Sequence, residues 1–303
     1  MINPLQSRNG TPLLSSGVLF ALGAALLFGL STPAAKALGA GISPQLLAGL
    51  LYLGAGLGLS LWMIIRKLLK PGAAPLRKPR GREWGWLAAA VASGGVIGPV
   101  LLMQGLARSD GAASSLLLNL ESVLTGALAW LVFKEKFSLR VLIGMSVIFA
   151  GGLIISWNGS PSLTTLAGPL LVAAACLAWA LDNNFTRKIA DCDPLFSAAI
   201  KGGVGAAVNC GIALMIGTAL PAPAWIAGAL LVGFLGYGLS IVCFIMALRQ
   251  LGAARTGAFF AIAPFCGALT AVAFGMSLFS GRLLAAGAVM AFGVWFLLRE
   301  EQQ

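Results

Sequence analysis

The sequence contains no histidine and only nine acidic residues among its 303 positions. The missing histidine excludes Ser-His catalysis and histidine-bound metals, because histidine is a common general base and metal ligand. Charged residues make up 10% of the chain and hydrophobic residues 59%. A soluble domain carries about 25% charged residues, and a disordered chain needs low hydrophobicity. Both classes are therefore excluded, and a polytopic membrane protein remains.

Cysteine is also scarce. The five cysteines are scattered singly, without CxxC or another metal-binding spacing, and are most simply small apolar fillers. The sequence has no GxSxG or HExxH motif and no glycine-rich phosphate loop. These absences argue against an intramembrane enzyme and against a nucleotide-driven pump. We expect no enzymatic activity, no metal and no cofactor.

Long apolar runs dominate the chain. A helix needs about 20 mostly apolar residues to cross roughly 30 Å of hydrocarbon, and its backbone must be satisfied within the crossing segment. The sequence offers ten such runs, at residues 17–38, 44–65, 84–106, 111–133, 139–157, 166–187, 194–216, 225–247, 254–275 and 281–298. The expected fold class is an all-α polytopic membrane protein with ten transmembrane helices.

Basic residues are distributed unevenly between the two sets of connecting loops. One set holds most of the 20 Lys and Arg residues, above all in segment 66–82, whereas the other holds Arg108 and Arg282, with Lys36 at a helix end. Cytoplasmic loops carry such an excess of positive charge. Ten spans and this bias predict that both termini are cytoplasmic. The net charge of +11 therefore reflects topology beside the lipid bilayer, not nucleic-acid binding.

The chain also contains an internal repeat. At an offset of 141 residues, matching positions are Trp84 and Trp225, Arg108 and Arg249, Gly111–Ala113 and Gly252–Ala254, and Gly126–Leu128 and Gly267–Leu269. At an offset of 151, Ser31 falls on Asp182 and Lys36 on Arg187. We predict two five-helix halves, 1–157 and 166–303. Because five is odd, the second half enters the membrane inverted, as in many secondary transporters.

Two segments carry a family resemblance. The first helix ends in Leu-Ser-Thr-Pro-Ala-Ala-Lys at 30–36, and residues 119–130 read Asn-Leu-Glu-Ser-Val-Leu-Thr-Gly-Ala-Leu-Ala-Trp. With ten spans in inverted halves, the chain resembles the EamA family of the drug/metabolite transporter (DMT) superfamily. The resemblance implies a carrier of amino acids, nucleotide derivatives, sugars, amines or drugs, and it favours export. The family often has proline after the glutamate of the fourth helix, where this sequence has Ser122.

Glu121 is the most conspicuous charge within the apolar runs. It lies about ten residues from either end of its span, which is roughly 15 Å from both surfaces. Ser114, Asn119 and Thr125 accompany it on the same helix, and a polar stripe in lipid should face the bundle interior. Glu121 either binds a cationic substrate group or exchanges a proton, or it is a hydrogen-bonded structural carboxyl. Its image in the second half is Ile262.

Asp182 and Lys201 form the second group of intramembrane charges. Asp182 precedes the cytoplasmic end of its helix by five residues and Lys201 follows the start of the next by seven, so both reach the same depth. They either form a structural ion pair or bind substrate. The further candidates for the same space are Asn183, Asn184, Asn209, Trp179 and Ser31, the first-half counterpart of Asp182. For Trp179, core packing is the alternative.

Together these features predict a secondary active transporter in the bacterial inner membrane, with both termini cytoplasmic. The expected substrate is a small polar metabolite, amino-acid-like or an amine, which is exported by alternating access with protons as candidate coupling ions. The alternatives are a uniporter or exchanger, an importer of nucleotide derivatives or lipid-linked sugars, a channel and an intramembrane enzyme. The expected assembly is a monomer or a homodimer.

Overall fold

The computed structural model of the protein describes residues 16–69, 77–132, 139–157, 163–189, 191–251, 256 and 259–300. Within these ranges the chain forms helices and connecting turns, with no strand. The first part comprises α1 (Ser16–Leu38), α2 (Pro44–Leu69), α3 (Glu83–Ala90), η1 (Val91–Ile97), α4 (Gly98–Arg108), α5 (Gly111–Leu117), α6 (Leu120–Leu131) and α7 (Leu139–Ser156). The second comprises α8 (Leu163–Arg187), α9 (Pro194–Met215), α10 (Pro223–Val232), η2 (Gly233–Leu239), α11 (Ser240–Leu251), α13 (Ala263–Ala273) and α14 (Gly281–Glu300).

The helices agree with the expected class of fold. Among the described residues, seven helical segments are long and apolar enough to cross a membrane. Three of these segments combine consecutive helices: α3, η1 and α4; α5 and α6; and α10, η2 and α11. Three shorter apolar helices lie at Leu142–Ser156, Ala263–Ala273 and Gly281–Phe296. The all-helical, multi-pass membrane protein is thus confirmed, whereas the number of ten crossings stays a prediction. Parts of the predicted spans 111–133 and 254–275, and both chain ends, lie outside the described residues.

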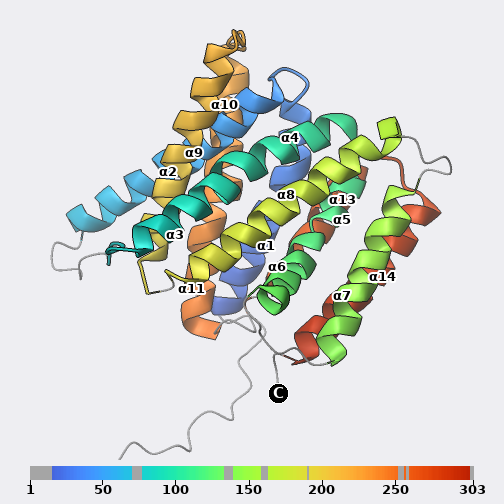
Figure 1. Ribbon diagram of the computed structural model, residues 1–303. Helices are drawn as coiled ribbons and strands as arrows, with labels where there is room; N and C mark the ends of the chain where they lie inside the picture. Colours follow the sequence, from blue (N-terminus) through green and yellow to red (C-terminus); the bar gives the residue numbers. More distant parts are fainter. Residues whose placement is uncertain are drawn as a thin grey trace, which may run out of the picture.

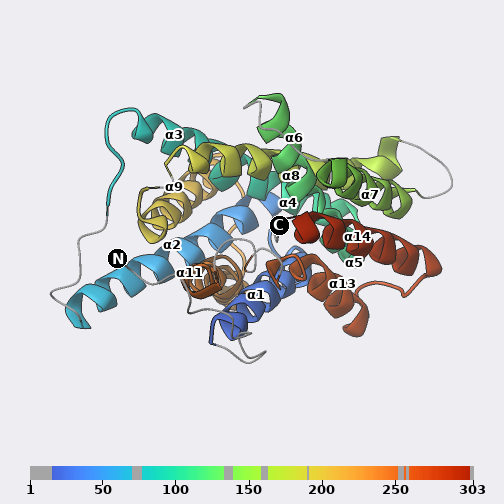
Figure 2. The same ribbon diagram turned by 90° about the horizontal axis from the view of Figure 1, so that it is seen from below.

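Helices that are distant in sequence pack side by side. The most extensive pairings join α2 with α9 and α7 with α14, while α1 packs on α11 and α13, and α8 packs on α4 and α6. Both views place the pair of α7 and α14 at one edge of the bundle, with α2, α3 and α9 at the other (Figures 1 and 2). The beginning of α1 and the end of α14 lie on the same side of the bundle, at the bottom of Figure 1.

Close packing between α2 and α9 depends on glycine. A Cβ atom on Gly56 would lie 2.8 Å from the backbone nitrogen of Gly203, and one on Gly202 would lie 2.8 Å from the Cα of Gly56. Side chains at these positions would push the two backbones apart, because carbon atoms in contact sit about 3.5–4.0 Å apart. Small residues at helix crossings are typical of membrane bundles, where packing and not hydrophobic burial holds the helices together.

One predicted helix is interrupted, which corrects the expectation of a continuous span at 111–133. The interruption lies at Leu118–Asn119, between α5 and α6. The Asn119 side chain donates to the Leu116 carbonyl, and the Ser122 hydroxyl donates to the Asn119 carbonyl. Such local side-chain bonds offer the backbone an alternative to regular helix bonding. The break therefore forms without the proline that the family often has at position 122.

Two further segments depart from regular α-helix. Residues Val91–Ile97 (η1) and Gly233–Leu239 (η2) are π-helical, with α-helix on both sides. Both are rich in glycine, which has low helix propensity. Isolated π-helical turns inside longer helices often occur at functional sites.

A polar cluster joins the linker before α3 to the linker before α9. The Arg77 guanidinium forms an ion pair with Glu83 at 2.8 Å and donates to the Cys192 sulfur at 3.1 Å. The backbone nitrogen of Asp193 also donates to the Arg77 carbonyl at 2.9 Å.

At the end of α1, the Lys36 ammonium donates to the carbonyls of Leu106 and Ser109. This position suits a cation, because the last carbonyls of α4 carry partial negative charge.

Candidate functional site

A cavity of about 400 Å³ lies among α1, α2, α6, α8, α9, η2 and α11. Its polar lining consists of Glu121, Asp182, Asn183, Lys201 and Ser240. Its aromatic lining consists of Phe28, Tyr52, Trp179, Tyr237, Phe244 and Phe260. Small-molecule sites commonly have this size and combine mostly apolar walls with a few polar groups.

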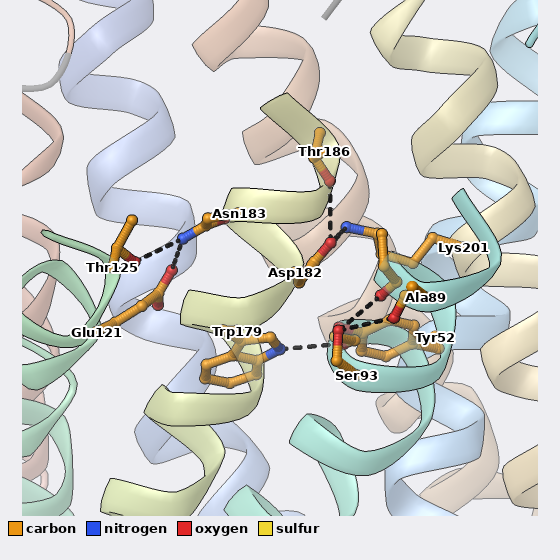
Figure 3. A network of polar contacts seen from close by, with 12 residues as sticks. Tyr52, Ala89, Ser93, Glu121, Thr125, Trp179, Asp182, Asn183, Thr186 and Lys201 are labelled. Carbon is orange, nitrogen blue, oxygen red and sulfur yellow. Dashed lines mark hydrogen bonds and ion pairs between the residues drawn. The ribbon is translucent and has the colours of Figure 1, made fainter. Parts of the chain in front are cut away.

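Asp182 and Lys201 form an ion pair at one side of the cavity (Figure 3). The Lys201 ammonium lies 2.7 Å from Oδ1 of Asp182 and 2.5 Å from Oδ2. The Thr186 hydroxyl donates a further bond to Oδ1 at 3.0 Å. Asp182 is buried, and a charge in such a place needs a partner. The two groups satisfy each other while both still line the cavity.

Glu121 lies in the first turn of α6, directly after the interruption of the helix. The Asn183 amide donates to its Oε1 at 2.9 Å and to the Thr125 hydroxyl at 3.3 Å (Figure 3). In the part of the chain that the structure describes, Glu121 has no Lys or Arg within ion-pair distance. The first turn of a helix favours a negative charge, because its backbone N–H groups carry partial positive charge.

The π-helical segment η1 packs against the ion pair of Asp182 and Lys201. The Gly94 carbonyl accepts hydrogen bonds from the Tyr52 hydroxyl at 2.7 Å and from Nε1 of Trp179 at 3.1 Å. A Cβ atom on Gly94 would lie 2.0 Å from Oδ2 of Asp182. Only glycine leaves room for the carboxylate here. The same residue thus orders two aromatic side chains and accommodates the charge pair.

Five of the predicted site residues meet at the cavity: Glu121, Trp179, Asp182, Asn183 and Lys201. The structure places the other four, Ser31, Asn119, Asn184 and Asn209, outside its lining, and each is buried. Asn119, in the turn after α5, donates to the Leu116 carbonyl of α5, and Ser31 donates to the Phe28 carbonyl of its own helix. Ser31 also contacts Tyr237, which does line the cavity.

Asn184 and Asn209, which we expect to share the space of Asp182 and Lys201, lie outside the cavity lining. At about 100° per residue, Asn184 lies about 200° round α8 from Asp182. Asn209 lies within about 80° of Lys201 on α9, and the side chains of both reach η1 at Gly95. Asn184 instead donates to the carbonyls of Thr125 and Ala180.

Asn209 of α9 is hydrogen-bonded to the backbone of η1. Its side chain donates to the carbonyls of Gly95 and Val96 at 3.4 and 3.3 Å, and its Oδ1 accepts from Gln45 at 3.1 Å. The buried Asn209 amide therefore links α9 to the backbone of η1.

The aromatic lining was missed by the sequence analysis, apart from Trp179. The chain has only two tyrosines, Tyr52 and Tyr237, and both line the cavity with their ring centroids 5.8 Å apart. A usable signal exists: each lies well inside an apolar run, away from the interface where tyrosine is enriched in membrane helices. A buried tyrosine hydroxyl usually needs a hydrogen-bond partner, so this placement indicates a polar interior.

Comparison with known proteins agrees with this architecture. The model of the EamA-like transporter family matches residues 15–157 and 166–299. An uncharacterized transporter of Methanothermobacter thermautotrophicus is 28% identical over 295 residues, covering 93% of this chain and 85% of that protein. The uncharacterized transporter YyaM of Bacillus subtilis is 23% identical over 177 residues, covering 54% of this chain and 57% of that protein.

A solved crystal structure has the same fold, with a TM-score of 0.68 at 19% identity, covering 93% of this chain and 96% of that one. The family match spans nearly the whole chain and agrees with the resemblance found at residues 30–36 and 119–130. The long apolar helices place the protein in a membrane. The chain therefore belongs to the EamA-like transporter family and is a multi-pass membrane transporter.

Proposed function

We propose that the protein is a secondary active transporter that moves a small polar metabolite, amino-acid-like or an amine, by alternating access. The observation that carries this proposal is the cavity of about 400 Å³, which is lined by Glu121, Asp182 and Lys201 together with aromatic side chains. Charges within a membrane are costly and generally mark substrate or ion pathways. A gradient supplies the driving force.

In the proposed architecture the chain consists of two five-helix halves, 1–157 and 166–303, with opposite orientations in the membrane. Supporting this, packing is reciprocal: α1 of the first half lies against α11 and α13 of the second, and α8 of the second lies against α4 and α6 of the first. The departures from α-helix also recur at nearly the same spacing, since η2 follows η1 by 142 residues and the turn at Ala261–Ile262 follows the turn at Leu118–Asn119 by 143. Inverted halves of this kind allow one site to open to either face.

The proposed topology has ten crossings, with both termini in the cytoplasm of a bacterial cell and the protein in its inner membrane. It is supported by the concentration of Lys and Arg in segment 66–82 and by the position of the beginning of α1 and the end of α14 on one side of the bundle (Figure 1). Export is the proposed direction, as the family resemblance favours it. The proposed assembly is a monomer or a homodimer.

Glu121 is the proposed coupling group. Its carboxylate faces the cavity and is held by the neutral amide of Asn183, so it can meet either a proton or a cationic substrate group. Exchange or uniport of a metabolite, and import of another metabolite class, are the alternatives within the same architecture. Exchange and uniport need no titratable coupling group, so Glu121 favours proton coupling over these two.

Flux measurements in proteoliposomes test the proposal. Purified protein should move a metabolite, chosen by thermal-shift screening against amino acids, amines and nucleotides, at a rate that depends on an imposed pH gradient. Glu121→Gln should abolish this dependence, whereas the control Asp191→Asn, which removes an exposed loop carboxylate, should retain it. Wild-type pH dependence in folded Glu121→Gln protein would exclude the coupling role.

A further inference from the structure

The aromatic lining forms a continuous chain of ring contacts through the cavity. The ring of Tyr52 lies 5.8 Å from that of Tyr237, which lies 5.9 Å from Phe28. Phe28 in turn lies 5.5 Å from Phe260, which lies 5.0 Å from Phe244. These side chains come from α1, α2, η2, α11 and the segment before α13. An occupant of the cavity therefore meets five mutually contacting aromatic side chains.

The charges that line the cavity are not equivalent. Lys201 is engaged by both oxygens of Asp182, so this pair contributes no net charge. Glu121 contacts the neutral amide of Asn183, and within the described ranges no cation is paired with it. Among the described lining residues, Glu121 is thus the carboxylate whose charge is left for an occupant to balance.

We infer, on the basis of the proposed transport function, that the cavity selects a monovalent organic cation with an apolar or aromatic body, in preference to a zwitterionic amino acid with the same body. In this arrangement the ammonium group of the ligand pairs with Glu121. The apolar body of the ligand lies against the contacting rings from Tyr52 to Phe244. Aromatic faces attract cations through their quadrupole, so both features favour the same ligand charge.

A zwitterion fits this arrangement less well. Its carboxylate needs a cation or several hydrogen-bond donors, and the only lysine of the described lining is already bound to Asp182. Taking Lys201 from Asp182 would leave the buried Asp182 carboxylate unpaired, and breaking a buried ion pair by removing one partner is strongly unfavourable. The ligand carboxylate would also lie in the same cavity as Glu121, where like charges repel.

A matched ligand panel tests this inference. The probes are 2-phenylethylamine, phenylalanine, 3-phenylpropionate and 2-phenylethanol, which share a body and differ in charge. Binding to purified wild-type protein is measured by thermal shift and by isothermal titration. We expect 2-phenylethylamine to bind at least about 10-fold more tightly than phenylalanine, and 3-phenylpropionate to bind most weakly. In Glu121→Gln the preference for the amine over 2-phenylethanol should disappear, while Asp191→Asn should keep it.

A second variant addresses the aromatic wall and does not alter any charge. Phe260→Leu removes the ring that links Phe28 to Phe244 and should weaken 2-phenylethylamine binding about 3- to 10-fold, with a smaller effect on 3-phenylpropionate. If Glu121→Gln fails to fold, Phe260→Leu and the wild-type ligand panel still test the inferred selectivity for cations. Equal losses for amine and acid would overturn the role given to the rings.

The outcomes separate the substrate class from the transport function. If phenylalanine or 3-phenylpropionate binds wild-type protein as tightly as the amine, or if no probe binds, the inferred cation selectivity is wrong. The proposed transporter is judged independently, by the flux of any metabolite found in the broad screen. Absence of pH-dependent flux for every binding compound would overturn the proposed function itself, even if amines bind.

Discussion

The ammonium group of Lys201 contacts both carboxylate oxygens of Asp182, at 2.7 and 2.5 Å, and the pair joins α8 to α9 across the wall of the cavity. Asp182 is only 5% exposed. Its charge is therefore tolerated because Lys201 neutralises it, with help from the Thr186 hydroxyl. The pair is at once a structural link and part of the lining, so its two roles must be separated by experiment.

Replacing Lys201 alone should destabilise the protein. Lys201→Met leaves the Asp182 carboxylate buried without a cation, and breaking a buried pair in this way costs about 3–5 kcal/mol. The melting temperature in detergent should fall clearly, and in the double variant Asp182→Asn/Lys201→Met it should largely recover. A single variant as stable as wild type would show that the pair is not structural, and a loss of ligand affinity would then assign it to substrate binding.

Gly94 should tolerate no side chain. In Gly94→Ala the new Cβ would lie 2.0 Å from the Asp182 carboxylate, so the ion pair or η1 must shift, at a cost of about 1–3 kcal/mol as in other overpacked interiors. Gly85→Ala, on the same predicted span but with no atom within 4 Å of the added Cβ, is the matched control. Thermal melts of both variants should show a loss for Gly94→Ala alone. Similar melts would contradict the close packing of η1 on Asp182.

Much of the architecture could be predicted from the sequence, because lipid imposes strong rules. Twenty-residue apolar runs indicate helices, and the equal depth of Asp182 and Lys201 made an ion pair one of the two expected arrangements. The interruption at Leu118–Asn119 and the π-helical η1 could not be predicted in this way. η1 depends on donors that reach its carbonyls only after packing, such as Asn209 from α9 and Tyr52 from α2. The interruption depends on the local bonds of Asn119 and Ser122, which apolar periodicity does not register. Periodicity likewise put Asn209 on the face of Lys201, and both side chains reach η1, but Asn209 lies outside the cavity lining.

Asn209 should support the cavity without contacting the substrate. Asn209→Ala removes the donor to the Gly95 and Val96 carbonyls, and leaving a buried polar group unsatisfied costs about 1–3 kcal/mol. We expect a lower melting temperature and faster amide hydrogen exchange in residues 91–97. Exchange in α14, which is remote from η1, serves as the internal control. Unchanged exchange at η1 together with weaker ligand binding would instead make Asn209 a ligand-binding residue.

The thiol of Cys192 should react slowly at neutral pH. Burial, together with the nearby Glu83 carboxylate, raises the pKa of this thiol above its ordinary value, so the reactive thiolate is scarce at pH 7 and increases as the pH rises towards that pKa. Alkylation by iodoacetamide, quantified on the Cys192 peptide by mass spectrometry, should accelerate with pH. Glu83→Gln should accelerate it at pH 7, because the carboxylate that raises the pKa of the thiol is lost. Labelling of wild-type Cys192 at the rate of a free cysteine would refute this environment.

The central claim is that the cavity beside Glu121 opens to the two faces of the membrane in turn. It is tested most directly with a single cysteine at Ala198, a lining residue, in a variant without the five native cysteines. A membrane-impermeant maleimide is applied to one face at a time in vesicles of known orientation, with and without a transported ligand. We expect labelling from both faces, with the ligand or a pH gradient shifting the ratio between them. Labelling confined to one face under every condition, in protein that still transports, would contradict the account.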